Sequence, residues 1–118
     1  MTPRILLAYW GEHQSFIKDE LSEYEVVVSY DPMTAVANAE DKGRRFDLML
    51  LDAEKEDSFE AVEYARDCGC EAKVIFCSKD DEVRQRVRAA EANCDAFVLL
   101  PDELGDVCLI VKALLEDL

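Results

Sequence analysis

Three side chains that can take part in site chemistry stand where apolar runs of the sequence end. Tyr9 and Trp10 close a run that begins at Ile5, and Asp52 closes the run LMLLD. A carboxylate is a hard oxygen ligand of the kind that Mg²⁺ prefers, and a phenol or an indole can donate a hydrogen bond to it. An aspartate in this position can equally end a strand and cap a turn. The choice depends on which elements bring these residues together.

Five apolar runs have the length of β-strands, and each is nearly continuous rather than alternating. Such runs are typical of strands that are covered on both faces of a sheet. The predicted strands are 5–9, 26–30, 48–51, 74–77 and 97–100.

The segments between these runs have helical spacing. Capping patterns predict three helix starts, at Asp31-Pro32, at Asp57 with Glu60, and at Ser78 with Asp81. In the helix after Ser78, three apolar residues share one face: Val83, Val87 and Ala90. The last predicted helix has a long apolar stripe, formed by Leu104, Val107, Cys108, Val111, Leu114, Leu115 and Leu118.

Five alternating β and α units predict an α/β fold of class (βα)5. Parallel pairing with right-handed crossovers gives a doubly wound, flavodoxin-like three-layer sandwich, with strand order 2-1-3-4-5 and a single domain over residues 1–118. In such a sheet the working crevice lies at the carboxyl ends of the first and third strands. Tyr9, Trp10 and Asp52 are therefore expected to meet there.

The composition narrows the classes of function. A net charge of -14 keeps the chain soluble and disfavours a nucleic-acid partner. No signal peptide and no membrane-spanning segment is recognisable, which predicts a cytoplasmic protein without a membrane partner. The five cysteines are expected to be mostly buried thiols, and Cys68-Gly69-Cys70 is interpreted as a loop rather than a metal or redox site.

Taken in order, these segments resemble the receiver domain of bacterial response regulators, the CheY-like phospho-acceptor module of two-component signalling. The resemblance covers essentially the whole chain. It rests on RILLAYW, YEVVVSYD, FDLMLLD, KVIFCSKDDE and NCDAFVLLPDEL, which follow one another with the family's spacing.

The resemblance implies a role for several residues. Asp52 matches the phosphorylated aspartate, Ser78 the switch hydroxyl, and Phe97 the aromatic whose rotation reports phosphorylation. Glu54 stands where the family uses a backbone carbonyl as a metal ligand. For Ser78 the more ordinary interpretation is a helix N-cap, and for Phe97 a packed aromatic.

The departures from the family concern the chemistry. Tyr9 and Trp10 replace its acidic pair, Leu100 replaces its lysine, and AEKEDSFE after Asp52 lacks its Pro-Gly stretch. Phosphoryl transfer needs charge neutralisation by a metal and a cation, so the substitutions predict weak phosphorylation. We therefore expect no metal, with Asp52 and Glu54 as weak candidates and Glu12 too displaced to help. Tyr9 or Trp10 could instead donate a hydrogen bond to Asp52 and plug the crevice.

The sequence thus predicts a pseudo-receiver without enzymatic activity or cofactor, which acts through protein contacts. The family's usual contact surface comprises the fourth helix, fifth strand and fifth helix. Here Phe97, Leu109 and Ile110 are its candidate residues, for a signalling or histidine-kinase-related partner or for a homodimer through the last helix. The alternative is a working response regulator that a histidine kinase phosphorylates on Asp52 with an unusual Mg²⁺ site. A flavin-binding flavodoxin relative is disfavoured, because YWGEHQS is a poor phosphate loop.

Overall fold

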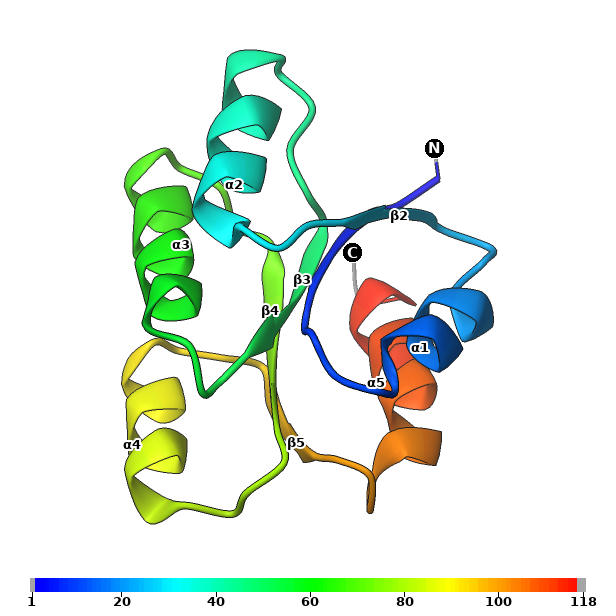
Figure 1. Cartoon of the computed structure of the whole chain (residues 1–118). Helices are drawn as coiled ribbons and strands as arrows, with labels where there is room; N and C mark the ends of the chain where they lie inside the picture. Colours follow the sequence, from blue (N-terminus) through cyan, green and yellow to red (C-terminus); the bar gives the residue numbers. More distant parts are fainter. Residues whose placement is uncertain (1, 117–118) are drawn as a thin grey trace.

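A computed structural model describes residues 2–116, in which five strands and five helices alternate (Figure 1). The strands are β1 (Arg4–Ala8), β2 (Glu25–Val28), β3 (Leu48–Asp52), β4 (Lys73–Ser78) and β5 (Ala96–Leu99). The helices are α1 (Gln14–Glu20), α2 (Pro32–Asp41), α3 (Glu56–Asp67), α4 (Val83–Glu91) and α5 (Leu104–Glu116). Leu118, which the sequence adds to the apolar stripe of the last helix, lies outside the described residues.

All five strands pair in parallel, in the order β2-β1-β3-β4-β5. This confirms the predicted (βα)5 fold and its strand order. β1 and β3 are neighbours, with Ala8 opposite Leu51, and β3 pairs with β4 so that Asp52 lies opposite Cys77. The carboxyl ends of β1, β3 and β4 therefore meet at one edge of the sheet, as the argument from topology requires.

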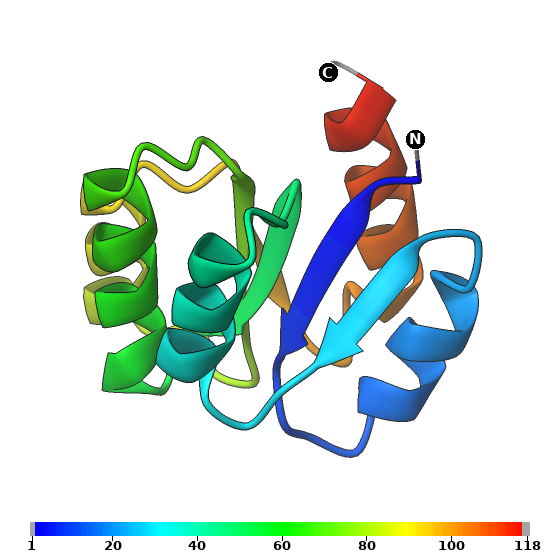
Figure 2. The same ribbon diagram turned by 90° about the horizontal axis from the view of Figure 1, so that it is seen from above.

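The sheet is the middle of three layers (Figure 2). α2, α3 and α4 cover one face and contribute to an apolar cluster around Leu6, Met49, Leu51 and Phe76. α1 and α5 cover the other face, where Leu7, Leu50, Ile75 and Val111 belong to a second apolar cluster. Burial on both faces explains why the strands read as continuous apolar runs.

Two of the predicted helix starts differ from the structure. Asp31 caps α2 as expected, because its side chain accepts the N–H of Thr34 at 3.2 Å. α3 begins one residue before Asp57, at Glu56, so the pattern of Asp57 and Glu60 does not form the N-cap. The predicted cap at Ser78 is also wrong, because Ser78 is the last residue of β4 and α4 begins only at Val83.

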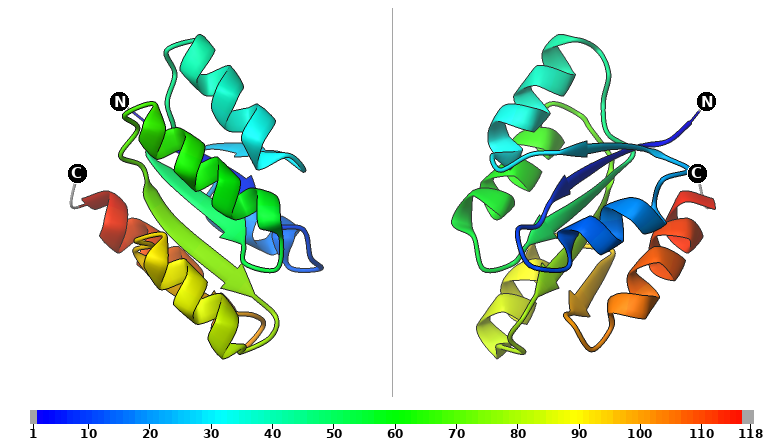
Figure 3. Two further views of the ribbon diagram at one scale, coloured as in Figure 1. Left: turned by 90° about the vertical axis from the view of Figure 1, so that its left-hand side faces the viewer. Right: turned by 45° about the vertical axis from the view of Figure 1, so that its right-hand side comes forward.

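The apolar face predicted for α4 does not face the core. Ala89 is the buried residue of α4, whereas Val83 is 76% and Val87 50% exposed. α4 thus presents apolar side chains outward, next to the edge strand β5. Figure 3 shows α4 and α5 on the two sides of this strand.

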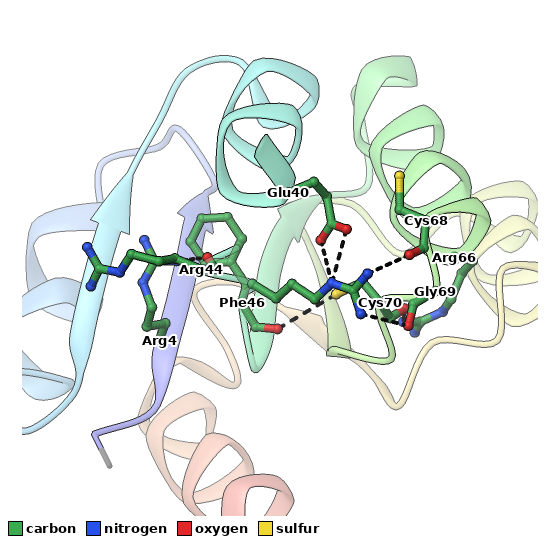
Figure 4. A network of polar contacts seen from close by, with 9 residues as sticks. Arg4, Glu40, Arg44, Phe46, Arg66, Cys68, Gly69 and Cys70 are labelled. Carbon is green, nitrogen blue, oxygen red and sulfur yellow. Dashed lines mark hydrogen bonds and ion pairs between the residues drawn. The ribbon is translucent and has the colours of Figure 1, made fainter. Parts of the chain in front are cut away.

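Arginine side chains connect the segments at the amino ends of the strands, opposite the crevice (Figure 4). Arg45 pairs with Glu40 at the end of α2 and donates to the carbonyl oxygens of Cys68 and Gly69 after α3. Gly69 has a φ of +82°, which a residue with a side chain adopts only at a cost. The Cys68-Gly69-Cys70 segment is thus a tight turn that follows α3, with Cys70 buried and both thiols free.

No helix among residues 2–116 combines the length and the apolar character needed to cross a membrane.

Candidate functional site

Asp52 lies at the bottom of the crevice formed by the strand ends. It is the last residue of β3 and only 4% exposed. Its Oδ1 accepts the backbone N–H of Glu54 at 2.9 Å. Burial raises the pKa of the Asp52 carboxyl, and that hydrogen bond together with the charges of Lys55 and Lys79 opposes the rise.

Tyr9 fills the space beside this carboxylate. The residue is 1% exposed and belongs to the apolar cluster that also contains Leu100. Burial, reinforced by the nearby Cys77 and Asp52, raises the pKa of the Tyr9 phenol to about 12. The ring leaves no room at position 11, since a Cβ on Gly11 would lie 2.6 Å from the Tyr9 oxygen. Gly11 is required by this close approach, which the sequence did not reveal.

Trp10 points away from Asp52. Its indole N–H donates to the carbonyl oxygen of Ser29 at 3.1 Å, and its ring stacks on Tyr30 with centroids 3.4 Å apart. The predicted hydrogen bond from Trp10 to Asp52 is therefore wrong. The physical reason is side-chain alternation: Tyr9 and Trp10 are consecutive, and in an extended segment consecutive side chains take opposite sides. Tyr9 alone fills the crevice, and among the described residues its hydroxyl makes no hydrogen bond to Asp52, so that half of the prediction is wrong as well.

Ser78 ends β4 next to the strand that carries Asp52, and it is completely buried. Its hydroxyl oxygen lies 2.8 Å from the carbonyl oxygen of Asp80 and 2.6 Å from Oε1 of Gln85, and it accepts the N–H of Asp80. Ser78 thus holds the turn before α4. Gln85, whose side chain reaches back from α4, was missed by the sequence analysis because the contact crosses a turn.

Leu100, which the resemblance aligns with the family's lysine, is buried in the same apolar cluster as Tyr9. The peptide bond between Leu100 and Pro101 is cis. Phe97 is half-buried on β5, and the guanidinium of Arg86 lies 4.7 Å from its ring centroid. The three single residues that depart from the family's pattern, Tyr9, Trp10 and Leu100, follow the ends of strands β1 and β5, and of these Tyr9 and Leu100 pack in one cluster.

Two lysines, Lys55 and Lys79, bring positive charge to the crevice, where both lower the pKa of Asp52. Lys79 follows Ser78 and lines a pocket with Tyr9, Glu12, His13, Leu100 and Pro101 among others. Its charge lowers the pKa of Glu54, which burial and Asp52 raise more strongly. The resemblance aligns the family's lysine with Leu100, so it did not point to Lys55 or Lys79.

The residues present do not fit a magnesium ion. Within residues 2–116, no group of three or more His, Cys, Asp or Glu side chains converges as a metal site. Tyr9 offers a buried phenol, Trp10 offers an indole that is already bonded elsewhere, and one oxygen of Asp52 accepts a backbone N–H. Mg²⁺ requires several oxygen ligands in near-octahedral geometry, which this set does not supply.

The apolar residues proposed for protein contacts divide into two groups. Leu109 is 66% exposed on α5, whereas Ile110 packs partly into the cluster under α1 and α5. Val83 and Val87 of α4 add exposed apolar surface near Phe97 and were expected to form one face of their helix. The face made by α4, β5 and α5 is thus more apolar on α4 than the sequence indicated.

Comparison with known proteins identifies the fold. No protein-family model and no curated protein matches the sequence. Among solved structures, a response regulator from Thermotoga maritima superposes with a TM-score of 0.79 and 18% identity, over 98% of this chain and 99% of that one. A BeF3-activated DrrB receiver domain gives the same four values.

The receiver domain of the response regulator TorR, of the TMAO respiratory system, has a TM-score of 0.79 and 21% identity, with 98% of each chain covered. The protein therefore has the fold of response-regulator receiver domains. Identities this low describe the fold and leave the chemistry to the residues of the site.

Proposed function

We propose that this protein is a receiver-like module of two-component signalling that acts mainly through protein contacts rather than through phosphorylation of Asp52. The observation that carries the proposal is the burial of Tyr9 with Leu100. These side chains form apolar core at the two places where the family has a carboxylate and a lysine. Without those groups, neither the transfer step nor the phosphorylated state has its usual charge compensation.

The proposed contact surface is the face of α4, β5 and α5. Val83, Val87 and Leu109 expose apolar side chains that contribute nothing to the core, and the half-buried Phe97 lies on β5. Exposed apolar residues gathered on neighbouring elements mark protein-binding surfaces. Its partner is a signalling or histidine-kinase-related protein or a second copy of this chain.

Phosphorylation can be tested with a small phosphodonor. We would incubate the protein with acetyl phosphate and Mg²⁺ and measure phosphate incorporation by intact mass, with Asp52→Ala as the control. The proposal expects no incorporation above that of the control. Beryllofluoride, added while Trp10 fluorescence is recorded, is expected to leave the spectrum unchanged. Labelling that requires both Mg²⁺ and Asp52 would overturn the proposal.

The contact surface needs a separate test. Val87→Glu and Leu109→Glu place a charge on the proposed face, and Phe16→Glu places the same charge on α1, where Phe16 is 45% exposed. Analytical ultracentrifugation of the parent reports self-association. If the parent is a dimer, the first two variants are expected to dissociate it and Phe16→Glu to leave it intact. Loss of the dimer in Phe16→Glu alone would place the interface at α1 and not on the face of α4, β5 and α5.

A working phospho-acceptor is the second candidate, and the position of Asp52 favours it. The carboxylate ends β3, Ser78 ends the neighbouring strand, and Lys79 supplies a cation near both. In this case Lys79→Gln is expected to reduce labelling of Asp52 by acetyl phosphate. The control is Lys42→Gln, which removes one positive charge at the end of α2 and is expected to have no effect.

A further inference from the structure

Two aromatic rings from different loops form a rigid pair beside the crevice. Trp10 follows β1 and Tyr30 follows β2, and their rings stack with centroids 3.4 Å apart and planes inclined by 9°. The indole is fixed by its hydrogen bond to the carbonyl oxygen of Ser29. The pair therefore has a defined orientation before any partner arrives, which reduces the entropy that binding would cost.

One face of this pair is open to solvent. Tyr30 is 73% exposed, although Trp10 covers one side of its ring. A large aromatic side chain that is held in place and yet exposed is not explained by packing. The loops that present it contain no Lys or Arg between Tyr9 and Gln14 or between Ser29 and Thr34.

Elsewhere among the described residues, arginines cover three phenylalanine rings, all of them more buried than Tyr30. Within residues 2–116, Arg4, Arg86 and Arg88 lie 4.9, 4.7 and 4.2 Å from the ring centroids of Phe46, Phe97 and Phe59. No such cation lies over the Trp10–Tyr30 pair in this part of the chain. A guanidinium is planar and stacks on aromatic faces, so the open ring offers an arginine the same environment.

The surrounding charge also selects a cation. Glu12 lies two residues after Trp10 with its side chain 87% exposed, and Asp31 directly follows Tyr30. The whole chain carries a net charge of -14, which attracts a basic partner and repels an acidic one. The Asp31 carboxylate is already engaged, because its two oxygens accept hydrogen bonds from Thr34 at the start of α2, so Asp31 contributes charge rather than a free ligand. We propose that the Trp10–Tyr30 pair, together with Glu12, binds an arginine-bearing segment of a partner protein. This surface adjoins the β2 edge of the sheet and is independent of the face at β5.

Binding can be measured with fluorescein-labelled tetra-arginine amide, by anisotropy at about physiological ionic strength, where weak long-range attraction is screened. Tyr30→Ala is expected to weaken binding about two- to fivefold, and Tyr30→Phe, which keeps the stacked ring, to retain it. Phe16→Ala removes another exposed aromatic and is expected to bind as the parent does. Thermal unfolding of each variant checks that it is folded. Because Tyr30 is exposed, its replacement is expected to leave the fold intact.

A second pair of variants separates a local site from general attraction. Glu12→Gln and Glu60→Gln each remove one exposed negative charge, the first beside the aromatic pair and the second on α3. The proposal expects Glu12→Gln to weaken binding more than Glu60→Gln does. Equal losses for these two variants, or unchanged binding by Tyr30→Ala, would mean that the peptide is held by net charge alone, and the proposal would be wrong.

Discussion

Replacement of Gly11 by alanine tests whether Tyr9 is fixed in the crevice. A Cβ at position 11 would lie 2.6 Å from the Tyr9 oxygen, 2.8 Å from Cε2 and 2.9 Å from Cζ. Contacts shorter than 3 Å force the ring or the loop to move, and the buried ring has neighbours in the apolar cluster. Overpacking of this kind costs about 1–3 kcal/mol.

The sign of the effect is decisive. Where a glycine has space and no positive φ, alanine stabilises by about 0.4–1 kcal/mol, because it restricts the unfolded chain. Gly105 in α5 is the matched control, since a Cβ there meets nothing within 4 Å. We therefore expect Gly11→Ala to destabilise the protein and Gly105→Ala to stabilise it by about 0.5–1 kcal/mol.

Urea unfolding monitored by circular dichroism provides the assay, with free energies taken from the linear extrapolation. In thermal unfolding, each kcal/mol corresponds to about 4 °C in a domain of this size. Tyr9→Phe removes the atom of closest contact, so the same alanine is expected to cost less in that background. If Gly11→Ala were as stable as the parent or more stable, the ring would be free to move aside, and the argument that Tyr9 plugs the crevice would fail.

Three further predictions follow from burial and backbone geometry. Burial raises the pKa of Asp52 in the folded state above the ordinary 3.8, so ionisation of Asp52 lowers the free energy of unfolding. This loss is absent below pH 3.8 and complete above the folded pKa. Asp52→Asn should therefore be more stable than the parent near neutral pH, and the difference should vanish when urea unfolding is repeated at lower pH. The Tyr9 phenol, whose pKa burial raises from 10.0 to about 12, should ionise only at strongly alkaline pH in an ultraviolet pH titration, and Tyr9→Phe should remove that step. Gly69→Ala should cost about 1–2 kcal/mol at its φ of +82°, measured by the same unfolding assay, and an unchanged midpoint would show that the turn after α3 relaxes.

Local patterns in the sequence were sufficient for the fold. Continuous apolar runs mark strands that are buried on both faces, and Asp31-Pro32 marks the start of α2 at the correct residue. Alternation of strands and helices then leaves few topologies, because parallel strands require crossovers of one hand. The position of Asp52 at a strand end, next to the ends of β1 and β4, follows from that topology.

The tertiary structure decided what each side chain at the crevice does. The sequence placed Tyr9 and Trp10 together, but the alternation of a strand sends Tyr9 into the apolar cluster and Trp10 to Ser29 and Tyr30. Serine is a residue type that often caps helices, yet the Ser78 hydroxyl contacts Asp80 and Gln85 in the turn before α4. The valines of α4 repeat with helical spacing, which predicts a face but not its direction, and the packing of Ala89 against the sheet turns them outward. Periodicity and capping are local properties, whereas the direction of a side chain depends on neighbours that are distant in the sequence.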